Sequence, residues 1–279
     1  MYKASNLFAL GKQYRTLRTL TMAPNPTARQ PLKLLMLHGY TQSGSLFHAK
    51  SRALTKHIQK AFPLHEVTAI YPTGPLRLRP SEIPGHEPSG QPDDEIEAYG
   101  WWRRSNTANP PLYTGIEDGF AAVAQTLKTE GPFDGVVGFS QGAAMAAMVA
   151  SILEGRKDIF EHFAKVTEDG ATGMDIPAPF GEQIHPPLKF AICYSGFRAP
   201  GVRYKAFYEP AIATPVLHVL GTLDAVVEES RSRALIDACQ GEPEKDGSVV
   251  WHPGGHFLPS QRPYLDAAVV FIRKQMEDV

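Results

Sequence analysis

Apolar and polar residues are distributed along the chain in blocks that predict strands and helices in alternation. Short apolar runs, typical of strands buried on both faces, lie at 32–37, 67–71, 188–194, 216–220 and 248–251. Longer segments with apolar residues at helical spacing lie at 45–62, 115–128, 229–238 and 262–276. This alternation predicts an α/β fold with a doubly wound, mostly parallel sheet. In such sheets ligands bind where the carboxyl ends of the strands meet their loops.

One stretch, 133–148, changes abruptly from an extended run to a helix at Ser140. Its centre is Gly138-Phe139-Ser140-Gln141-Gly142, a G-x-S-x-G pattern between a β-branched pair and an alanine-rich segment. A strand, a sharp turn and a helix in this order predict a nucleophile elbow, in which the serine hydroxyl stands clear of the sheet. Glycine is needed at 138 and 142 because a side chain there would meet the neighbouring strand or helix.

A serine nucleophile needs an imidazole base and a carboxylate that orients the imidazole. Asp224 follows the apolar run 216–220, and His256 lies on a glycine-rich loop after the last predicted strand. The order Ser140, Asp224, His256 is the one that α/β-hydrolases use. Asp134 precedes the elbow strand, at the wrong end of the sheet, while Asp237 and Asp266 fall in predicted helices.

His252 remains an alternative base, although a structural role fits it better. His252 and His256 have the i, i+4 spacing of a zinc-binding helix, but a proline and two glycines between them exclude a regular helix. No Glu follows His252, so a metal site is not expected.

Acyl transfer also requires two N–H donors for the developing oxyanion. The backbone N–H of Gln141 is the first, and the helix dipole supports it. Tyr40, in the sequence His38-Gly39-Tyr40 after an early strand, is predicted to supply the second. His38 is expected to orient this loop. On this interpretation Gln141→Ala is mild where Ser140→Ala is severe.

Two insertions interrupt the alternating pattern. The segment 72–113 is rich in Pro, Gly and acidic residues, which indicates either a disordered segment or a functional lid. The segment 154–187 is a second insertion that could cap the active site. Within the first insertion, Trp101 and Trp102 point to opposite faces if the chain is extended there. One is then expected in the core and the other in a pocket.

The first thirty residues differ from the rest. They are basic and contain no Asp or Glu, and Leu7, Leu10, Tyr14 and Leu17 recur at helical spacing. Three interpretations stay open: the segment is a mitochondrial presequence, a disordered tail, or an upstream extension ahead of Met22. The predicted organisation is a basic extension at 1–30 and one domain at 31–279. We expect a cytoplasmic protein, or a mitochondrial one if 1–30 is a presequence.

The composition narrows the possible partners. With 43% hydrophobic residues among 279, the chain can bury a full core, and a formal net charge of −1 offers no positive field for nucleic acid. No apolar run approaches the roughly 18 residues of a membrane span. Cys193 and Cys239 lack C-x-x-C spacing, so buried thiols are favoured over a disulfide or metal site.

Several motifs together resemble one family. These are Leu37-His38-Gly39-Tyr40, Trp101-Trp102-Arg103-Arg104, Gly138 to Ala144, Tyr194-Ser195-Gly196-Phe197 and His252-Pro253-Gly254-Gly255-His256. They are similar in sequence and order to the fungal serine hydrolase family that is related to human ovarian cancer-associated protein 2. That family includes thioesterases that release polyketides. The resemblance, from about Leu32 to the C-terminus, implies an α/β-hydrolase fold, a triad on Ser140, Asp224 and His256, and no cofactor.

The sequence therefore predicts a serine hydrolase that cleaves carboxylic esters or thioesters through an acyl-enzyme on Ser140. The partner is an acyl ester or thioester, small or carrier-bound, with a polyketide synthase acyl carrier domain as one candidate. Trp102, Phe197 and Phe257 are the predicted substrate contacts, and Phe47 is a further aromatic candidate. A serine peptidase on the same scaffold and a non-catalytic binding protein are the alternatives.

Overall fold

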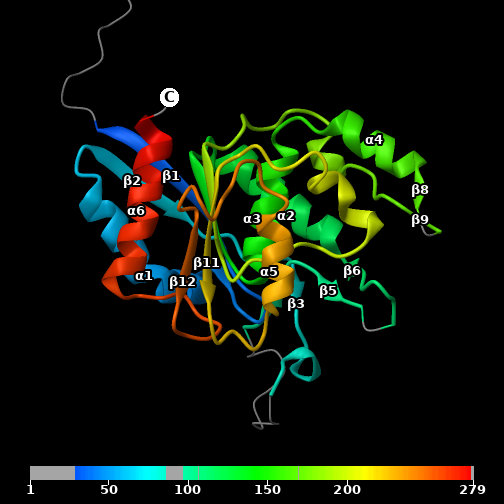
Figure 1. Ribbon diagram of the computed structural model, residues 1–279, viewed down its shortest axis with the longest axis horizontal. Coiled ribbons are helices and arrows are strands. Elements are labelled where there is room, and N and C mark those ends of the chain that lie inside the picture. Colours follow the sequence, from blue (N-terminus) through cyan, green and yellow to red (C-terminus); the bar gives the residue numbers. More distant parts are fainter. Residues whose placement is uncertain (1–28, 86–96, 106, 169, 278–279) are drawn as a thin grey trace, which may run out of the picture.

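The computed structural model describes residues 29–85, 97–105, 107–168 and 170–277 (Figure 1). The predicted presequence and nearly all of the 1–30 extension lie outside these residues. The strands are β1 (Gln30–Leu37), β2 (His65–Ile70), β3 (Leu76–Arg77), β4 (Tyr99–Gly100), β5 (Arg103–Arg104), β6 (Tyr113–Thr114), β7 (Gly135–Phe139), β8 (Thr167–Glu168), β9 (Ala171–Thr172), β10 (Phe190–Tyr194), β11 (Val216–Gly221) and β12 (Val249–His252). The helices are α1 (Gly44–Ala61), α2 (Ile116–Glu130), α3 (Gln141–Ile152), α4 (Lys157–Lys165), α5 (Glu229–Ile236) and α6 (Arg262–Glu277), with 3-10 turns η1 (Pro80–Glu82), η3 (Ala178–Phe180) and η4 (Val202–Phe207).

Six strands form one parallel sheet in the order β12-β11-β10-β7-β1-β2. From β1 the chain moves outward to β2, and it then returns to the other side of β1 with β7. The strand order therefore reverses between β1 and β7. In an open parallel sheet the crevice for ligands opens at the carboxyl ends of the strands beside such a reversal. The loops after β1 and β7 are the ones that border it.

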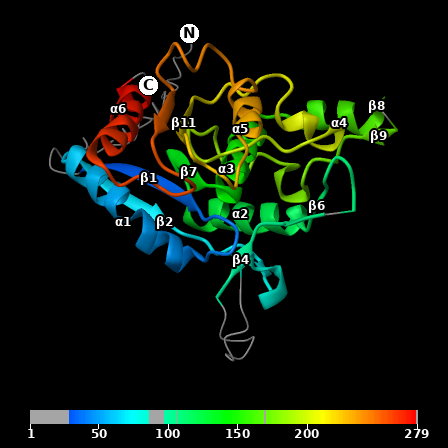
Figure 2. The same ribbon diagram turned by 60° about the horizontal axis from the view of Figure 1, so that its bottom comes forward.

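Helices cover both faces of the sheet, because every central strand has apolar residues on both faces. In β1, Leu34 and Met36 belong to the core cluster under α1 and α6, whereas Leu35 and Leu37 belong to the cluster under α2 and α3. Figures 1 and 2 show α1 and α6 side by side on one face and α2, α3 and α5 on the other. The predicted doubly wound, parallel architecture is confirmed, and the predicted element ends lie within two residues of the observed ones except in α3, which continues past Met148 to Ile152.

The two insertions contain more regular structure than the sequence predicted. In 72–113, β3 pairs with β4 and β5 pairs with β6 as short antiparallel ladders. In 154–187, α4 is followed by the hairpin of β8 and β9 and the turn η3. These pieces are too short for a periodic signal, and distant contacts stabilise them. The hydroxyl of Tyr204, for example, accepts the N–H of Tyr113 at 2.7 Å.

Both cysteines are buried free thiols, as predicted. Burial raises the pKa of both thiols, that of Cys239 to about 12. Across the described residues, no helix has the length and hydropathy that crossing a bilayer requires.

Candidate active site

Ser140 lies at the junction of β7 and α3 in a backbone conformation that few residues adopt. Its φ is 53°, outside the helical region, and its N–H donates to the carbonyl of Tyr194 at the end of β10. The turn is tight enough that a Cβ on Gly138 would lie 2.2 Å from the carbonyl oxygen of Gly142. A Cβ on Gly142 would lie 2.1 Å from the carbonyl oxygen of Leu37. These contacts give the predicted elbow its physical basis.

The side chains of Ser140, His256 and Asp224 form one chain of hydrogen bonds. His256 Nδ1 lies 2.7 Å from Asp224 Oδ2, and His256 Nε2 lies 2.9 Å from Ser140 Oγ. Since a carboxylate only accepts, Nδ1 carries the proton and Nε2 is free to accept the serine hydroxyl. The three residues follow β7, β11 and β12, so the sheet brings together positions that are 116 and 32 residues apart in the chain.

Asp224 is held as a carboxylate by three N–H donors around it. Its Oδ1 accepts the N–H groups of Val226 and Val227, both at 2.9 Å, while Oδ2 accepts from His256. Burial raises the pKa of Asp224, but the hydrogen bonds from Val227, His256 and Val226 outweigh it and leave the pKa below its usual value. Asp224 therefore remains ionised and available to orient the imidazole.

The competing acids lie elsewhere. Asp134, just before β7, accepts the backbone N–H of Lys33 and pairs with Lys189 at 3.0 Å. Asp266, on α6, pairs with His57 at 2.6 Å, and Asp237 ends α5.

His252 does not join the Ser140 chain of hydrogen bonds. Its ring is buried against Phe257 and Tyr264, and its Nε2 has no hydrogen-bond partner among the described residues. Burial lowers the pKa of His252, so it fits the core as a neutral ring.

The two predicted oxyanion donors border the Ser140 site. Gln141 is the first residue of α3, so no carbonyl within the helix accepts its N–H. Tyr40 lines the same cavity as Ser140, on the loop after β1. Neither backbone N–H donates to a described residue, which leaves both available to a ligand.

The side chain of Gln141 has a role that sequence reasoning missed. Its Oε1 accepts the N–H of Trp101 at 2.7 Å, and its Nε2 donates to the carbonyl of Trp102 at 2.9 Å. Gln141 is buried, so these two bonds connect the elbow to the loop between β4 and β5. The expectation of a mild Gln141→Ala variant considered the backbone N–H alone and did not include these side-chain bonds.

His38 fixes the loop that carries Tyr40. Its Nδ1 donates to the carbonyl of Gly39 and its Nε2 accepts the N–H of Gly74, both at 2.8 Å. Burial lowers the pKa of His38 to about 4, so the ring is neutral and can both donate and accept. The indole of Trp101 packs on this ring and donates to the carbonyl of His38 at 2.9 Å.

A cavity of about 570 Å³ opens at Ser140 and His256. Phe257, 44% exposed, lines it, whereas Trp102 and Phe197 do not. Trp102 is 1% exposed and stacks on Tyr113.

Phe47, on the buried face of α1, is fully buried and does not line the cavity. Trp101 is fully buried as well, so neither Trp101 nor Trp102 lines this cavity, although one of them was expected to line a pocket. The described residues of 154–187 are absent from the cavity wall, while 72–113 contributes Pro84. The full lining is Tyr40, Thr41, Gln42, Lys50, Pro84, Phe139, Ser140, Val226, His256, Phe257 and Leu258.

No group of three side chains suited to metal binding occurs among the described residues.

The chain matches the family described as Serine hydrolase (FSH1) over residues 27–268. It is 31% identical over 252 residues to Esterase OVCA2 of Danio rerio, covering 88% of this chain and 97% of that protein. It is 30% identical to Family of serine hydrolases 3 of Saccharomyces cerevisiae, covering 86% of this chain and 83% of that protein.

A dihydrofolate reductase of Schizosaccharomyces pombe is 32% identical over 84% of this chain, but the chain spans 45% of that relative's length. Among solved structures, acyl-protein thioesterase 2 of Zea mays superimposes with a TM-score of 0.53 at 21% identity. This superposition covers 90% of this chain and 96% of that one. The likeness shows a shared fold, the predicted α/β-hydrolase fold.

Proposed function

Because the chain belongs to the serine hydrolase (FSH1) family, we propose that it cleaves carboxylic esters or thioesters through an acyl-enzyme on Ser140. The observation that carries this proposal is the continuous hydrogen-bonded chain from Ser140 through His256 to Asp224. We take 31–279 as the hydrolase domain.

In the first half of the reaction, Ser140 Oγ attacks the acyl carbon while His256 Nε2 accepts the hydroxyl proton. Asp224 stabilises the imidazolium that results. The carbonyl oxygen becomes an oxyanion, which the N–H groups of Gln141 and Tyr40 stabilise, and the positive end of the α3 dipole favours the charge. The tetrahedral intermediate collapses when His256 donates its proton to the departing alcohol or thiol.

In the second half, His256 accepts a proton from water, and the resulting hydroxide attacks the acyl carbon on Ser140. A second oxyanion forms in the same position. Its collapse returns the proton from His256 to Ser140 Oγ and releases the carboxylic acid. The two proton transfers balance, so the cycle uses water and needs no cofactor.

The cavity favours a substrate with an apolar acyl group. Phe139, Val226, Phe257 and Leu258 line it beside Ser140, and Lys50 stands at its wall as a single basic residue. The names of the relatives, an esterase and an acyl-protein thioesterase, agree with either an oxygen or a sulfur leaving group. A carrier-bound thioester fits this chemistry, but none of the relatives named above points to a polyketide synthase.

The direct test replaces the nucleophile. Ser140→Ala is expected to lower kcat by roughly 10⁴-fold or more and to abolish covalent labelling by a fluorophosphonate. Activity is measured on p-nitrophenyl esters of increasing acyl length and on the matching acyl thioesters. Ser81→Ala, which alters an exposed serine of η1, is the matched control and leaves both readouts unchanged.

Equal labelling of Ser140→Ala and the parent protein would contradict the proposal. Cleavage of aminopeptide substrates in place of the esters would favour the peptidase alternative. Absence of turnover across both acyl series would favour a binding protein.

A further inference from the structure

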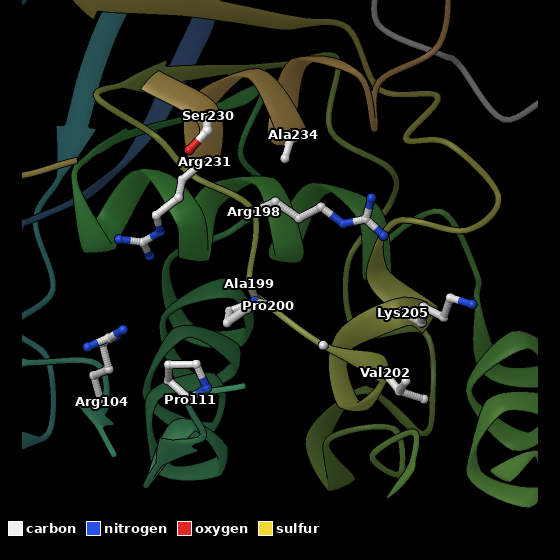
Figure 3. Close-up of a pocket in the computed structure, with 11 residues that line it drawn as sticks. Arg104, Pro111, Arg198, Ala199, Pro200, Val202, Lys205, Ser230, Arg231 and Ala234 are labelled. Carbon is white, nitrogen blue, oxygen red and sulfur yellow. The ribbon is translucent and has the colours of Figure 1, made fainter. Parts of the chain in front are cut away.

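A second cavity, of about 530 Å³, lies on the face of the sheet that carries α3 and α5 (Figure 3). Its lining has four basic residues and no acidic one, and it shares no residue with the cavity at Ser140. The basic residues come from four separate elements, β5, the loop after β10, η4 and α5. They are Arg104, Arg198, Lys205 and Arg231.

Two of the four cations have carboxylate partners. Arg198 pairs with Glu209 at 3.2 Å, and Lys205 pairs with Glu168 at 2.6 Å and with Glu209 at 3.7 Å. By contrast, Arg104 and Arg231 form no ion pair with any acidic side chain in the described part of the chain. The cavity therefore retains two guanidinium charges that the described residues do not neutralise.

These two arginines face a common region. In Figure 3 both guanidinium groups extend toward the same side of the cavity, whereas Arg198 and Lys205 point to the other side. The buried hydroxyl of Tyr113 lies near them. Burial raises the pKa of Tyr113 to about 12, and the charges of Arg231 and Arg104 both oppose that increase.

Arg231 is held in an orientation suited to anion binding. Its guanidinium stacks over the ring of Phe197, with 4.2 Å from Cζ to the ring centroid. Stacking uses the face of the guanidinium and leaves the N–H donors at its edge available, and this edge matches the oxygens of a phosphate. Two like charges with no counter-ion between them repel, so a bound anion would relieve this repulsion.

We propose that this cavity binds a small organic phosphate monoester, with the phosphate between Arg104 and Arg231. A monoester phosphate carries close to two negative charges near neutral pH, which matches two unneutralised guanidinium groups. Each arginine can donate two parallel N–H bonds to it. Pro111, Ala199 and Pro200 give the cavity apolar walls against which the organic part of the ligand packs. The site is separate from the esterase chemistry at Ser140 and does not depend on it.

The test uses isothermal titration calorimetry with phenyl phosphate on the whole protein at about pH 7.5, where the phosphate is a dianion. Phenyl sulfate, of similar shape with a single charge, is the matched ligand and is expected to bind about tenfold more weakly. Arg231→Gln and Arg104→Gln are each expected to weaken phenyl phosphate binding by about tenfold. Arg52→Gln, which removes an exposed charge on α1 across the sheet, leaves it unchanged.

Protein whose Ser140 has first been modified by a fluorophosphonate retains phenyl phosphate binding. Binding to the modified protein would show that phenyl phosphate does not occupy the oxyanion site at Ser140. It also lets this proposal fail or succeed independently of the esterase proposal. Arg104 is exposed, so Arg104→Gln remains informative even if Arg231→Gln does not fold. Three outcomes would each overturn the proposal. They are no binding up to about 10 mM, equal binding of the sulfate, and equal binding by Arg104→Gln.

Discussion

At the scale of single residues, Gln141 serves the site in two separate ways. Its backbone N–H points out of the first turn of α3, where an oxyanion is proposed to form. Its side chain pairs with the backbone of both tryptophans in the loop between β4 and β5. The same residue thus positions an oxyanion donor and holds the neighbouring loop against the elbow.

Gln141→Ala is therefore expected to destabilise the protein by about 2–4 kcal/mol, because it leaves a buried N–H and a buried carbonyl without partners. The free energy of unfolding is measured by urea denaturation. Gln125→Ala, an exposed glutamine-to-alanine change within α2, serves as the control and changes this free energy by less than about 0.5 kcal/mol. Equal effects of the two substitutions would show that the side-chain bonds of Gln141 do not matter for stability.

The sequence predicts the role of Ser140 but not the contacts of the Gln141 side chain. A serine between glycines, an acid after a strand and a histidine on a glycine-rich loop are local signals, and their order suggested a triad. The partners of the Gln141 side chain lie 40 and 39 residues earlier in the chain. No local pattern encodes that contact, so only the folded arrangement reveals it. The same reason explains why Trp102 was expected to touch substrate, whereas it packs on Tyr113.

At the scale of elements, the junction of β7 and α3 leaves no space for side chains where the helix crosses the end of β1. A Cβ on Gly142 would lie 2.1 Å from the carbonyl oxygen of Leu37 and 2.4 Å from that of His38. Both obstacles are backbone atoms, which cannot rotate away as a side chain could. The approach of α3 to β1 also sets the distance between Ser140 and the loop that carries Tyr40.

Gly142→Ala is thus expected to destabilise the protein by about 3 kcal/mol through overpacking. Gly181→Ala is the matched control, since Gly181 has helical backbone angles and its Cβ would approach the carbonyl of Ala178 at 3.3 Å. Thermal unfolding compares the two variants, and fluorophosphonate labelling reports whether any folded Gly142→Ala retains a reactive serine. A Gly142→Ala protein as stable as Gly181→Ala would disprove the close packing at this junction.

The long elements were predictable because burial on two faces leaves a strong pattern. Strand β10 is a continuous apolar run, β11 is apolar apart from the buried His218, and α1 and α6 have one apolar stripe each. The pattern fails for β3 to β6 and β8 to β9, whose strands are two residues long, and for α4, in which Phe160 is the one buried residue described. These short elements are stabilised by contacts with distant parts of the chain, which their own sequences do not reveal.

At the scale of the whole molecule, burial keeps several histidines neutral. Burial lowers the pKa of His38 to about 4 and that of His218 to about 3, and it lowers those of His185 and His252 as well. His38, directly after β1, and His218, within β11, are both almost completely buried. In the unfolded chain each of these rings would titrate near its ordinary pKa of about 6.5.

The sign of the resulting pH dependence follows from proton uptake. Between pH 6.5 and pH 4 the unfolded chain binds protons at His38 and His218 and the folded protein does not, so acid favours unfolding. The stability that these neutral rings give is complete above pH 6.5 and decreases as the pH falls. Asp224 has a lowered pKa and loses its contribution in the same direction, but below the ordinary aspartate pKa. The histidines therefore dominate the change between pH 7 and pH 5.

At pH 5 each of His38 and His218 is expected to cost about 2 kcal/mol relative to pH 7, or about 4 kcal/mol together. That sum is a large part of the roughly 5–15 kcal/mol that stabilises a typical domain, so partial acid unfolding near pH 5 is expected. Urea denaturation at pH 7, 6 and 5 measures how the free energy of unfolding changes with pH. In His38→Gln the loss of unfolding free energy between pH 7 and pH 5 is expected to be about 2 kcal/mol smaller than in the parent protein. His48→Gln, at an exposed position of α1, is the control and leaves this loss unchanged. If His38→Gln retains the slope of the parent protein, the buried neutral ring is not the origin of the acid sensitivity.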